Sequence, residues 1–95
     1  MSERRILTPD ELSRALPSLT GWSVINGKLH KEFKLRDFKR AFGFMASVAL
    51  IAESLDHHPD WSNVYNRVVI DLVTHDLGGI STMDVKFAEM VEGIQ

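Results

Sequence analysis

Residues 37–56 read DFKRAFGFMASVALIAESLD, and their apolar side chains recur at the three- and four-residue spacing of an α-helix. Two apolar rows run along this predicted helix. The first contains Phe38, Ala41, Phe42, Met45, Ala49 and Ala52, and the second contains Phe44, Val48, Ile51 and Leu55. Together the two rows form an apolar surface that is wider than contact with one sheet requires. Either the helix is deeply buried at the centre of the domain, or part of this face, with the second row the candidate, packs against another subunit.

The segment before this helix predicts a short helix followed by a β-hairpin. Thr8 is expected to cap the short helix within a capping box that Glu11 completes. Residues 22–25 and 28–35 then predict two strands. The Asn26-Gly27 pair between them is preferred in a two-residue type I′ hairpin turn.

The segment after residue 56 predicts two more strands and a last helix. Residues 62–65 and 67–74 have an extended pattern, and in the second range Val68, Ile70 and Leu72 alternate toward one face. Ser81 is expected to cap the last helix, with the acid Asp84 at its third position. The order α-β-β-α-β-β-α predicts an α+β domain, with a four-stranded antiparallel sheet and the helices packed on one face.

Length and composition predict one compact domain over residues 1–95. A net charge of -2 gives no general reason to bind nucleic acid directly, and the basic stretch 28–40 is interrupted by acids. The chain has no cysteine, no apolar stretch of membrane-spanning length and no apolar segment typical of a signal peptide near its first residues. We therefore expect a cytoplasmic protein that does not bind a membrane.

Three of the four histidines, His57, His58 and His75, gather around one acidic and aromatic stretch. Imidazoles titrate near neutrality, so a pair of them can act as acid and base together, which suits the addition or elimination of water. His57 and His58 are expected at the negative end of the long helix, which favours an imidazolium. Glu53 lies four residues before His57, where its carboxylate can orient an imidazole or simply face solvent.

The residues around the histidines have both functional and structural interpretations. Pro59 is expected to end the long helix, and His75 to close a strand and project into a cleft. Trp61 and Tyr65 either wall a flat ligand or pack the domain. Asp84 is interpreted first as a helix cap. A zinc site is disfavoured, because adjacent side chains such as His57 and His58 rarely converge on one ion.

Three segments of the chain closely resemble the pterin-4a-carbinolamine dehydratase family, also called the dimerization cofactor of a hepatocyte nuclear factor. They are RAFGFM at 40–45, AESLDHHPDWSNVYN at 52–66, and the pair Thr74-His75. The family signature is met by Glu53, His57, His58, Pro59, Tyr65, His75 and Asp84. Two positions differ from the pattern of the animal members, which have a glutamate where this chain has Asp76 and a basic residue where it has Met83. These positions bear on contacts to the pterin side chain or to the subunit interface.

The resemblance implies a lyase that removes water from 4a-hydroxytetrahydrobiopterin to give quinonoid dihydropterin, in tetrahydrobiopterin recycling, without a metal or cofactor. It implies catalytic roles for His57, His58, His75 and Glu53. Pterin contacts are implied for His57, His58, Pro59, Thr74, His75, Asp76 and Leu77, and Trp61 is added as an apolar wall. We expect His57 or His75 to protonate the departing hydroxyl, the other to take the N5 proton, and His58 to position the ring.

Two other functions fit the same resemblance. One is an oligomeric binding module or transcriptional coactivator, because the family includes members that clamp a protein partner through the long helix. We expect a homodimer or homotetramer through this helix. The other is a pterin enzyme of molybdopterin or folate metabolism, which the residues do not distinguish from tetrahydrobiopterin recycling.

Overall fold

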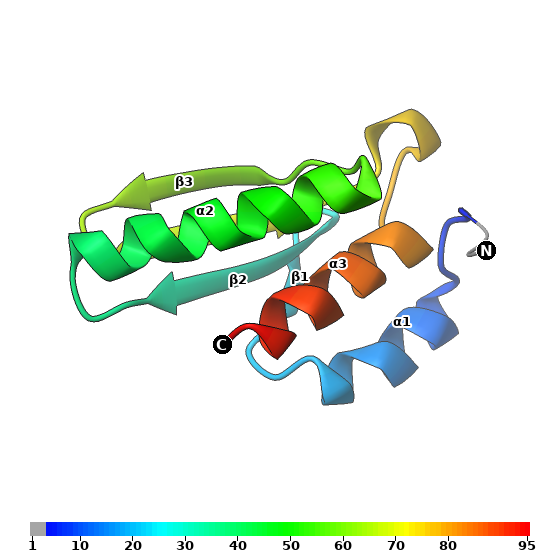
Figure 1. The fold of residues 1–95 in the computed structure, drawn as a ribbon. Helices are drawn as coiled ribbons and strands as arrows, with labels where there is room; N and C mark the ends of the chain where they lie inside the picture. The colour runs from blue at the N-terminus through cyan, green and yellow to red at the C-terminus, as the bar shows by residue number, and fades with distance from the viewer. Residues whose placement is uncertain (1–3) are drawn as a thin grey trace.

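The computed structural model describes residues 4–95. Residues 1–3 of the domain expected over residues 1–95 lie outside the described residues. Within residues 4–95 there are three α-helices, two 3-10 helices and four strands (Figure 1). Their bounds are α1 Pro9–Ala15, η1 Leu16–Ser18, β1 Ser23–Ile25, β2 Lys28–Lys34, α2 Phe38–Leu55, β3 Asp60–Val64, β4 Arg67–Leu72, η2 His75–Leu77 and α3 Thr82–Gly93. The predicted order α-β-β-α-β-β-α is confirmed.

The strands form one antiparallel sheet in the order β1-β2-β4-β3. Asn26 and Gly27 both have positive φ values, 53° and 74°, as the predicted type I′ turn between β1 and β2 requires. Strand β4 lies between β2 and β3, so side chains of both neighbouring strands flank its inward-facing side chains. Val68, Ile70 and Leu72 are each 0% exposed. Burying each contributes about 1.5–3 kcal/mol to stability.

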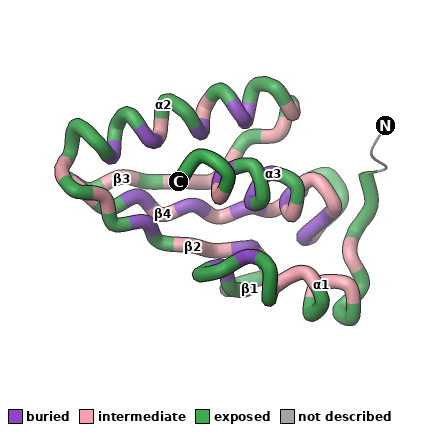
Figure 2. The backbone as a smooth tube through the Cα atoms, turned by 60° about the horizontal axis from the view of Figure 1, so that its bottom comes forward, coloured by how far each residue is buried: buried purple, intermediate pink, exposed green. Residues whose placement is uncertain are grey.

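Helices α2 and α3 cover the same face of the sheet (Figure 2). The opposite sheet face carries alternate side chains that form ion pairs between strands. They join Lys28 to Asp60, His30 to Asp71 and Glu32 to Arg67. This division into an apolar covered face and a charged uncovered face is the pattern of an α+β domain with helices on one side.

The two apolar rows of α2 have unequal burial. Phe44, Val48 and Ile51 of the second row are buried in the core, at 8%, 0% and 8% exposure. In the first row, Phe38 and Phe42 are 50% and 61% exposed. Of the two alternatives, a subunit contact through the second row was therefore wrong, because this row packs in the protein's own core. The apolar side chains left for a partner belong mainly to the first row.

Strands β3 and β4 are shifted relative to their predicted ranges. Strand β3 begins at Asp60 and ends at Val64, and β4 ends at Leu72. Tyr65 instead lies in the turn between them, with a φ of 52° and an exposure of 62%. Tyr65 thus neither packs the core nor extends the strand. By the rise of a strand, it lies roughly 16 Å from the other end of β3, where the sequence continues to the histidines.

No helix within the described range 4–95 is both long and apolar enough to cross a membrane.

Candidate active site

The end of α2 separates the side chains of the two adjacent histidines. Asp56 adopts a left-handed conformation, with φ 48° and ψ 45°, and its N–H donates to the carbonyl oxygens of Ala52 and Glu53. The His57 N–H donates back to the Ala52 carbonyl oxygen at 3.1 Å, as in a Schellman motif. The prediction that Pro59 ends the helix was therefore wrong, because α2 already stops at Leu55.

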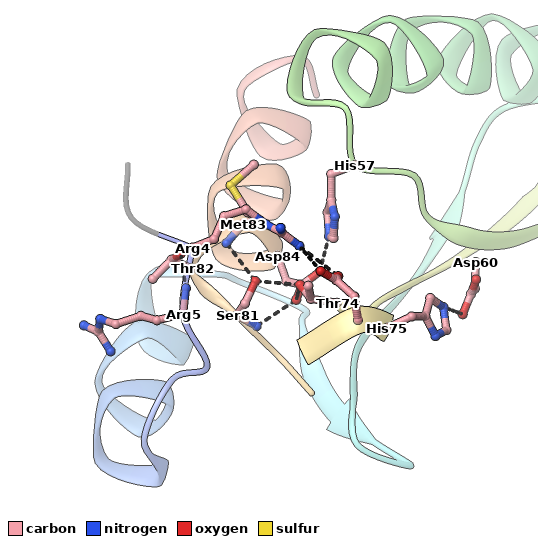
Figure 3. A network of polar contacts seen from close by, with 11 residues as sticks. Arg4, Arg5, His57, Asp60, Thr74, His75, Ser81, Thr82, Met83 and Asp84 are labelled. Carbon is pink, nitrogen blue, oxygen red and sulfur yellow. Dashed lines mark hydrogen bonds and ion pairs between the residues drawn. The ribbon is translucent and has the colours of Figure 1, made fainter. Parts of the chain in front are cut away.

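His57 turns inward and meets the first turn of α3. Its Nε2 atom lies 2.5 Å from Oδ1 of Asp84 (Figure 3). The His57 side chain is 11% exposed, and that of Asp84 is 0% exposed. The Phe87 ring packs edge-on against the imidazole, with 6.3 Å between ring centroids. A carboxylate only accepts, so in the ionised form of Asp84 the proton between the two groups belongs to Nε2, and Nδ1 is the second nitrogen available for chemistry.

The other carboxylate oxygen of Asp84 is held by its own helix cap and by a neighbouring loop. Oδ2 accepts from the backbone N–H of Ser81 at 2.8 Å and from the Thr74 hydroxyl at 2.8 Å. The predicted capping box of Ser81 and Asp84 is present. Asp84 is thus a helix cap and also the partner of His57. Its carboxylate is buried, and every buried polar side-chain atom among the described residues has a hydrogen-bond partner.

His58 turns outward and pairs with Glu53. Its Nε2 atom lies 2.6 Å from Oε2 of Glu53, and the two side chains are 59% and 74% exposed. The spacing in the sequence suggested that Glu53 would face His57, but the left-handed residue Asp56 ends the helical register before His57. Glu53 therefore orients the exposed imidazole and not the buried one.

His75 lies in η2, beyond the end of β4, so it does not close the strand as expected. Its side chain is 70% exposed and points toward Asp60, with 3.3 Å between Nε2 and Oδ2 (Figure 3). The same Asp60 oxygen accepts from Lys28 at 2.9 Å. The Lys28 hydrogen bond lowers the pKa of Asp60, and His75 acts in the same direction.

The remaining predicted contact residues surround η2 and the start of β3. Asp76 accepts from Arg4 at 2.8 and 3.1 Å, and this contact lowers the pKa of Asp76. Leu77 is 38% exposed, and Thr74 is 2% exposed. Trp61 points to the core face of the sheet and packs there, half-buried. The structure thus brings His57, His75 and their carboxylates to one end of the molecule and places Tyr65 away from it.

Two surface hollows lie elsewhere. One, of about 560 Å³, lies between α2 and the end of α3 and is lined by residues such as Arg40, Phe44 and Ile94. The other, of about 350 Å³, lies between α1 and α3. Neither is lined by a histidine. Among residues 4–95, no group of three or more His, Cys, Asp or Glu side chains is arranged to hold a metal ion.

Two carboxylate partners of the histidines, and the lysine that binds one of these carboxylates, were not recognised from the sequence. Asp84 carried a visible capping signal, but its approach to His57 depends on how α3 packs against the end of α2. Asp60 pairs with His75, and Lys28 pairs with Asp60, only because β2, β3 and β4 bring these residues to one sheet end. The alternation of side chains along β2 places Lys28 on the uncovered face of the sheet. This is the one local feature of the sequence that indicates its contact with Asp60.

The fold and site define a class: a small α+β protein whose histidines are each paired with a carboxylate. Comparison with known proteins gives the family. The model of the family described as pterin 4 alpha carbinolamine dehydratase matches residues 5–94. The chain therefore belongs to the pterin-4-alpha-carbinolamine dehydratase family.

Individual relatives agree with this assignment. A protein of Solibacter usitatus, provisionally named a pterin-4-alpha-carbinolamine dehydratase, is 50% identical and the match covers 93% of each chain. One from Prochlorococcus marinus with the same provisional name is 45% identical, covering 98% of this chain and 97% of its own. A crystal structure from Brucella melitensis, described as a transcriptional coactivator/pterin dehydratase, is 46% identical. It has a TM-score of 0.90 and covers 95% of this chain and 98% of its own.

Proposed function

We propose that this protein is a hydro-lyase that dehydrates a pterin 4a-carbinolamine. In this reaction the bond between C4a and the hydroxyl oxygen breaks, N5 loses its proton, and a C4a=N5 double bond forms. The products are water and a quinonoid dihydropterin. The observation that carries the proposal is the buried contact between His57 and Asp84 in a member of this family, together with two exposed imidazoles, His58 and His75, that also have carboxylate partners.

The environments of the two main histidines suggest different roles. Asp84 holds a proton on Nε2 of neutral His57, so Nδ1 has a free lone pair and suits a general base that takes the N5 proton. His75 is exposed and lies 3.3 Å from Asp60, and we assign it the role of the acid that protonates the departing hydroxyl. His58, held by Glu53, then positions the pterin ring. Of the two assignments expected from the resemblance, this proposal selects His57 as the base and His75 as the acid.

Single substitutions test the proposal. The assay follows dehydration of synthetic 4a-hydroxytetrahydropterin above its spontaneous rate. We expect His57→Ala and His75→Ala each to lower kcat by roughly 10²- to 10⁴-fold. His30→Ala is the matched control, because this histidine pairs with Asp71 on the uncovered sheet face. Near-normal turnover in both site variants, or an inactive wild-type protein, would overturn the proposal.

Self-association through α2 is a second part of the proposal. Phe38, Phe42 and Leu50 are 50%, 61% and 73% exposed, and the first two rings lie 5.8 Å apart. Exposed aromatic pairs of this kind are typical of contact surfaces. The Brucella protein's description as a coactivator also supports a binding role. A homodimer or homotetramer through α2 would cover these side chains. A cytoplasmic role in tetrahydrobiopterin recycling, or in another pterin pathway, stays a prediction.

A further inference from the structure

A chain of hydrogen bonds connects the start of α3 to the His57 ring. The Met83 N–H donates to the Ser81 hydroxyl oxygen at 3.1 Å, and the Ser81 and Thr74 hydroxyl oxygens lie 2.6 Å apart. The Thr74 hydroxyl donates to Asp84 at 2.8 Å, and Asp84 contacts His57 at 2.5 Å. Figure 3 shows these side chains converging beneath the imidazole.

Counting protons fixes the direction of this chain. A hydroxyl has one proton to donate, and an ionised carboxylate has none. Because the Thr74 proton is used on Asp84, the proton between the two hydroxyls must come from Ser81. Every donor therefore points along the chain toward the carboxylate, and His57 approaches the same carboxylate with Nε2–H from the other side.

We infer that Ser81 and Thr74 are positioning residues of the catalytic site, which set the orientation of the Asp84 carboxylate and, through it, the tautomer of His57. Thr74, Ser81 and Asp84 are 2%, 0% and 0% exposed. In such surroundings hydrogen bonds in series strengthen one another, and the positive end of α3 adds to the field on the carboxylate. The inference deepens the proposed function and depends on it for its kinetic consequences.

The charged groups that face His57 come from α3 and η2. Asp84 faces it from α3, and Asp76 acts on it from η2, since the charge of His57 helps to lower the pKa of Asp76. The larger influence on Asp76 is its hydrogen bond from Arg4. The hydroxyl chain acts only on Asp84, so its effect on His57 is separable from that of the Arg4 contact.

The first measurement is the tautomer of His57 in the wild-type protein, by ¹⁵N NMR of the imidazole nitrogens above neutral pH. We expect the proton on Nε2 and a lone pair on Nδ1. A proton on Nδ1 would overturn the inference. This result is independent of enzyme activity, so an inactive protein with the expected tautomer would overturn the proposed function and leave the positioning role standing.

The second measurement uses Thr74→Val, which removes the hydroxyl at nearly constant volume, with Thr74→Ser as the variant that restores it. We expect Thr74→Val to lose the single His57 tautomer, to shift the pKa of the acidic limb of the kcat profile, where the general base titrates, and to lower kcat about tenfold with a smaller change in KM. Thr74→Ser should recover most of this. Unchanged tautomer and pH profile in folded Thr74→Val would contradict the inference.

The two capping boxes of the chain provide a matched control for Ser81. Ser81 and Thr8 both cap a helix with their hydroxyls, but only Ser81 contacts Thr74. Glycine is tolerated at a cap, so Ser81→Gly and Thr8→Gly lose comparable local stability. We expect only Ser81→Gly to change the His57 spectrum and the pH profile. Equal effects from both variants would reduce Ser81 to a structural cap and overturn its positioning role.

Discussion

The Nε2 atom of His57 lies 2.5 Å from Oδ1 of Asp84, although the two residues are 27 positions apart in the sequence. This contact ties the end of α2 to the first turn of α3. Since the Asp84 side chain is fully buried and that of His57 is nearly so, solvent screens their interaction little. The pair is therefore both a structural link and the central element of the proposed site.

Asp84→Asn should reverse the tautomer of His57. The asparagine oxygen would accept the hydrogen bonds that the Thr74 hydroxyl and the Ser81 N–H give to Oδ2, so the amide NH₂ would face His57. Nε2 would then have to accept, and the imidazole proton would move to Nδ1. We expect kcat to fall by roughly 10²- to 10⁴-fold, as in other catalytic His-Asp pairs.

Stopped-flow kinetics and imidazole ¹⁵N shifts measure both effects in Asp84→Asn, and circular dichroism checks that the variant is folded. A folded variant with normal kcat would show that Asp84 serves only as a helix cap.

Glu53→Gln tests the exposed pair of Glu53 and His58 and should have a small effect on the free energy of unfolding. Both side chains of the Glu53–His58 pair are mostly exposed, and such pairs contribute about 0–1 kcal/mol. We expect an unfolding free energy within this range of wild type and a kcat lowered by less than about tenfold, because His58 is proposed to position the ring without transferring a proton. Urea unfolding and steady-state kinetics provide the comparison. A loss as large as in Asp84→Asn would instead place the proton transfer at His58.

The predictable part of this molecule is the part encoded locally. The capping box of Thr8, the Asn26-Gly27 turn and the alternation in β4 each depend on residues within one or two turns of each other. Their signals therefore do not require knowledge of the tertiary fold. The element order and the antiparallel sheet follow from them.

The site was predictable only in part, because the partners of the histidines come from other elements. The pattern located His57, His58 and His75 but linked Glu53 to the wrong imidazole, since one left-handed residue at Asp56 redirects the chain. The periodicity of the sequence also could not predict which apolar side chains of the two α2 rows are buried. Both rows have helical spacing, and only the position of the sheet decides that Val48 is inside and Phe42 outside.

Alanine substitutions should separate the two rows of α2. Phe44 is 8% exposed and stacks near Phe33, with 4.7 Å between ring centroids, so Phe44→Ala should cost about 3–5 kcal/mol of unfolding free energy. Phe42 is 61% exposed, and Phe42→Ala should change the free energy of a single chain by no more than about 0.5 kcal/mol. Urea unfolding at low protein concentration measures both.

The same Phe42→Ala variant tests self-association. Light scattering at micromolar concentration should show a dimer or tetramer for wild type and a smaller particle for the variant, because the exposed ring is proposed to be covered by a second copy. A monomeric wild-type protein would rule out this interface.

The pH dependence of stability should include a contribution from Glu11. The guanidinium of Arg5 donates to this carboxylate at 2.7 and 2.5 Å and lowers its pKa from 4.5 to about 2. A carboxyl with a lower pKa in the folded than in the unfolded chain stabilises the fold above its unfolded pKa. This contribution should be complete above about pH 5.5 and fall away as the pH drops toward 2. Glu11→Gln isolates the charge, since glutamine at this position still completes a capping box. The difference in urea midpoint between wild type and Glu11→Gln should shrink as the pH falls, and a difference that is constant from pH 7 to pH 2.5 would contradict the ion pair.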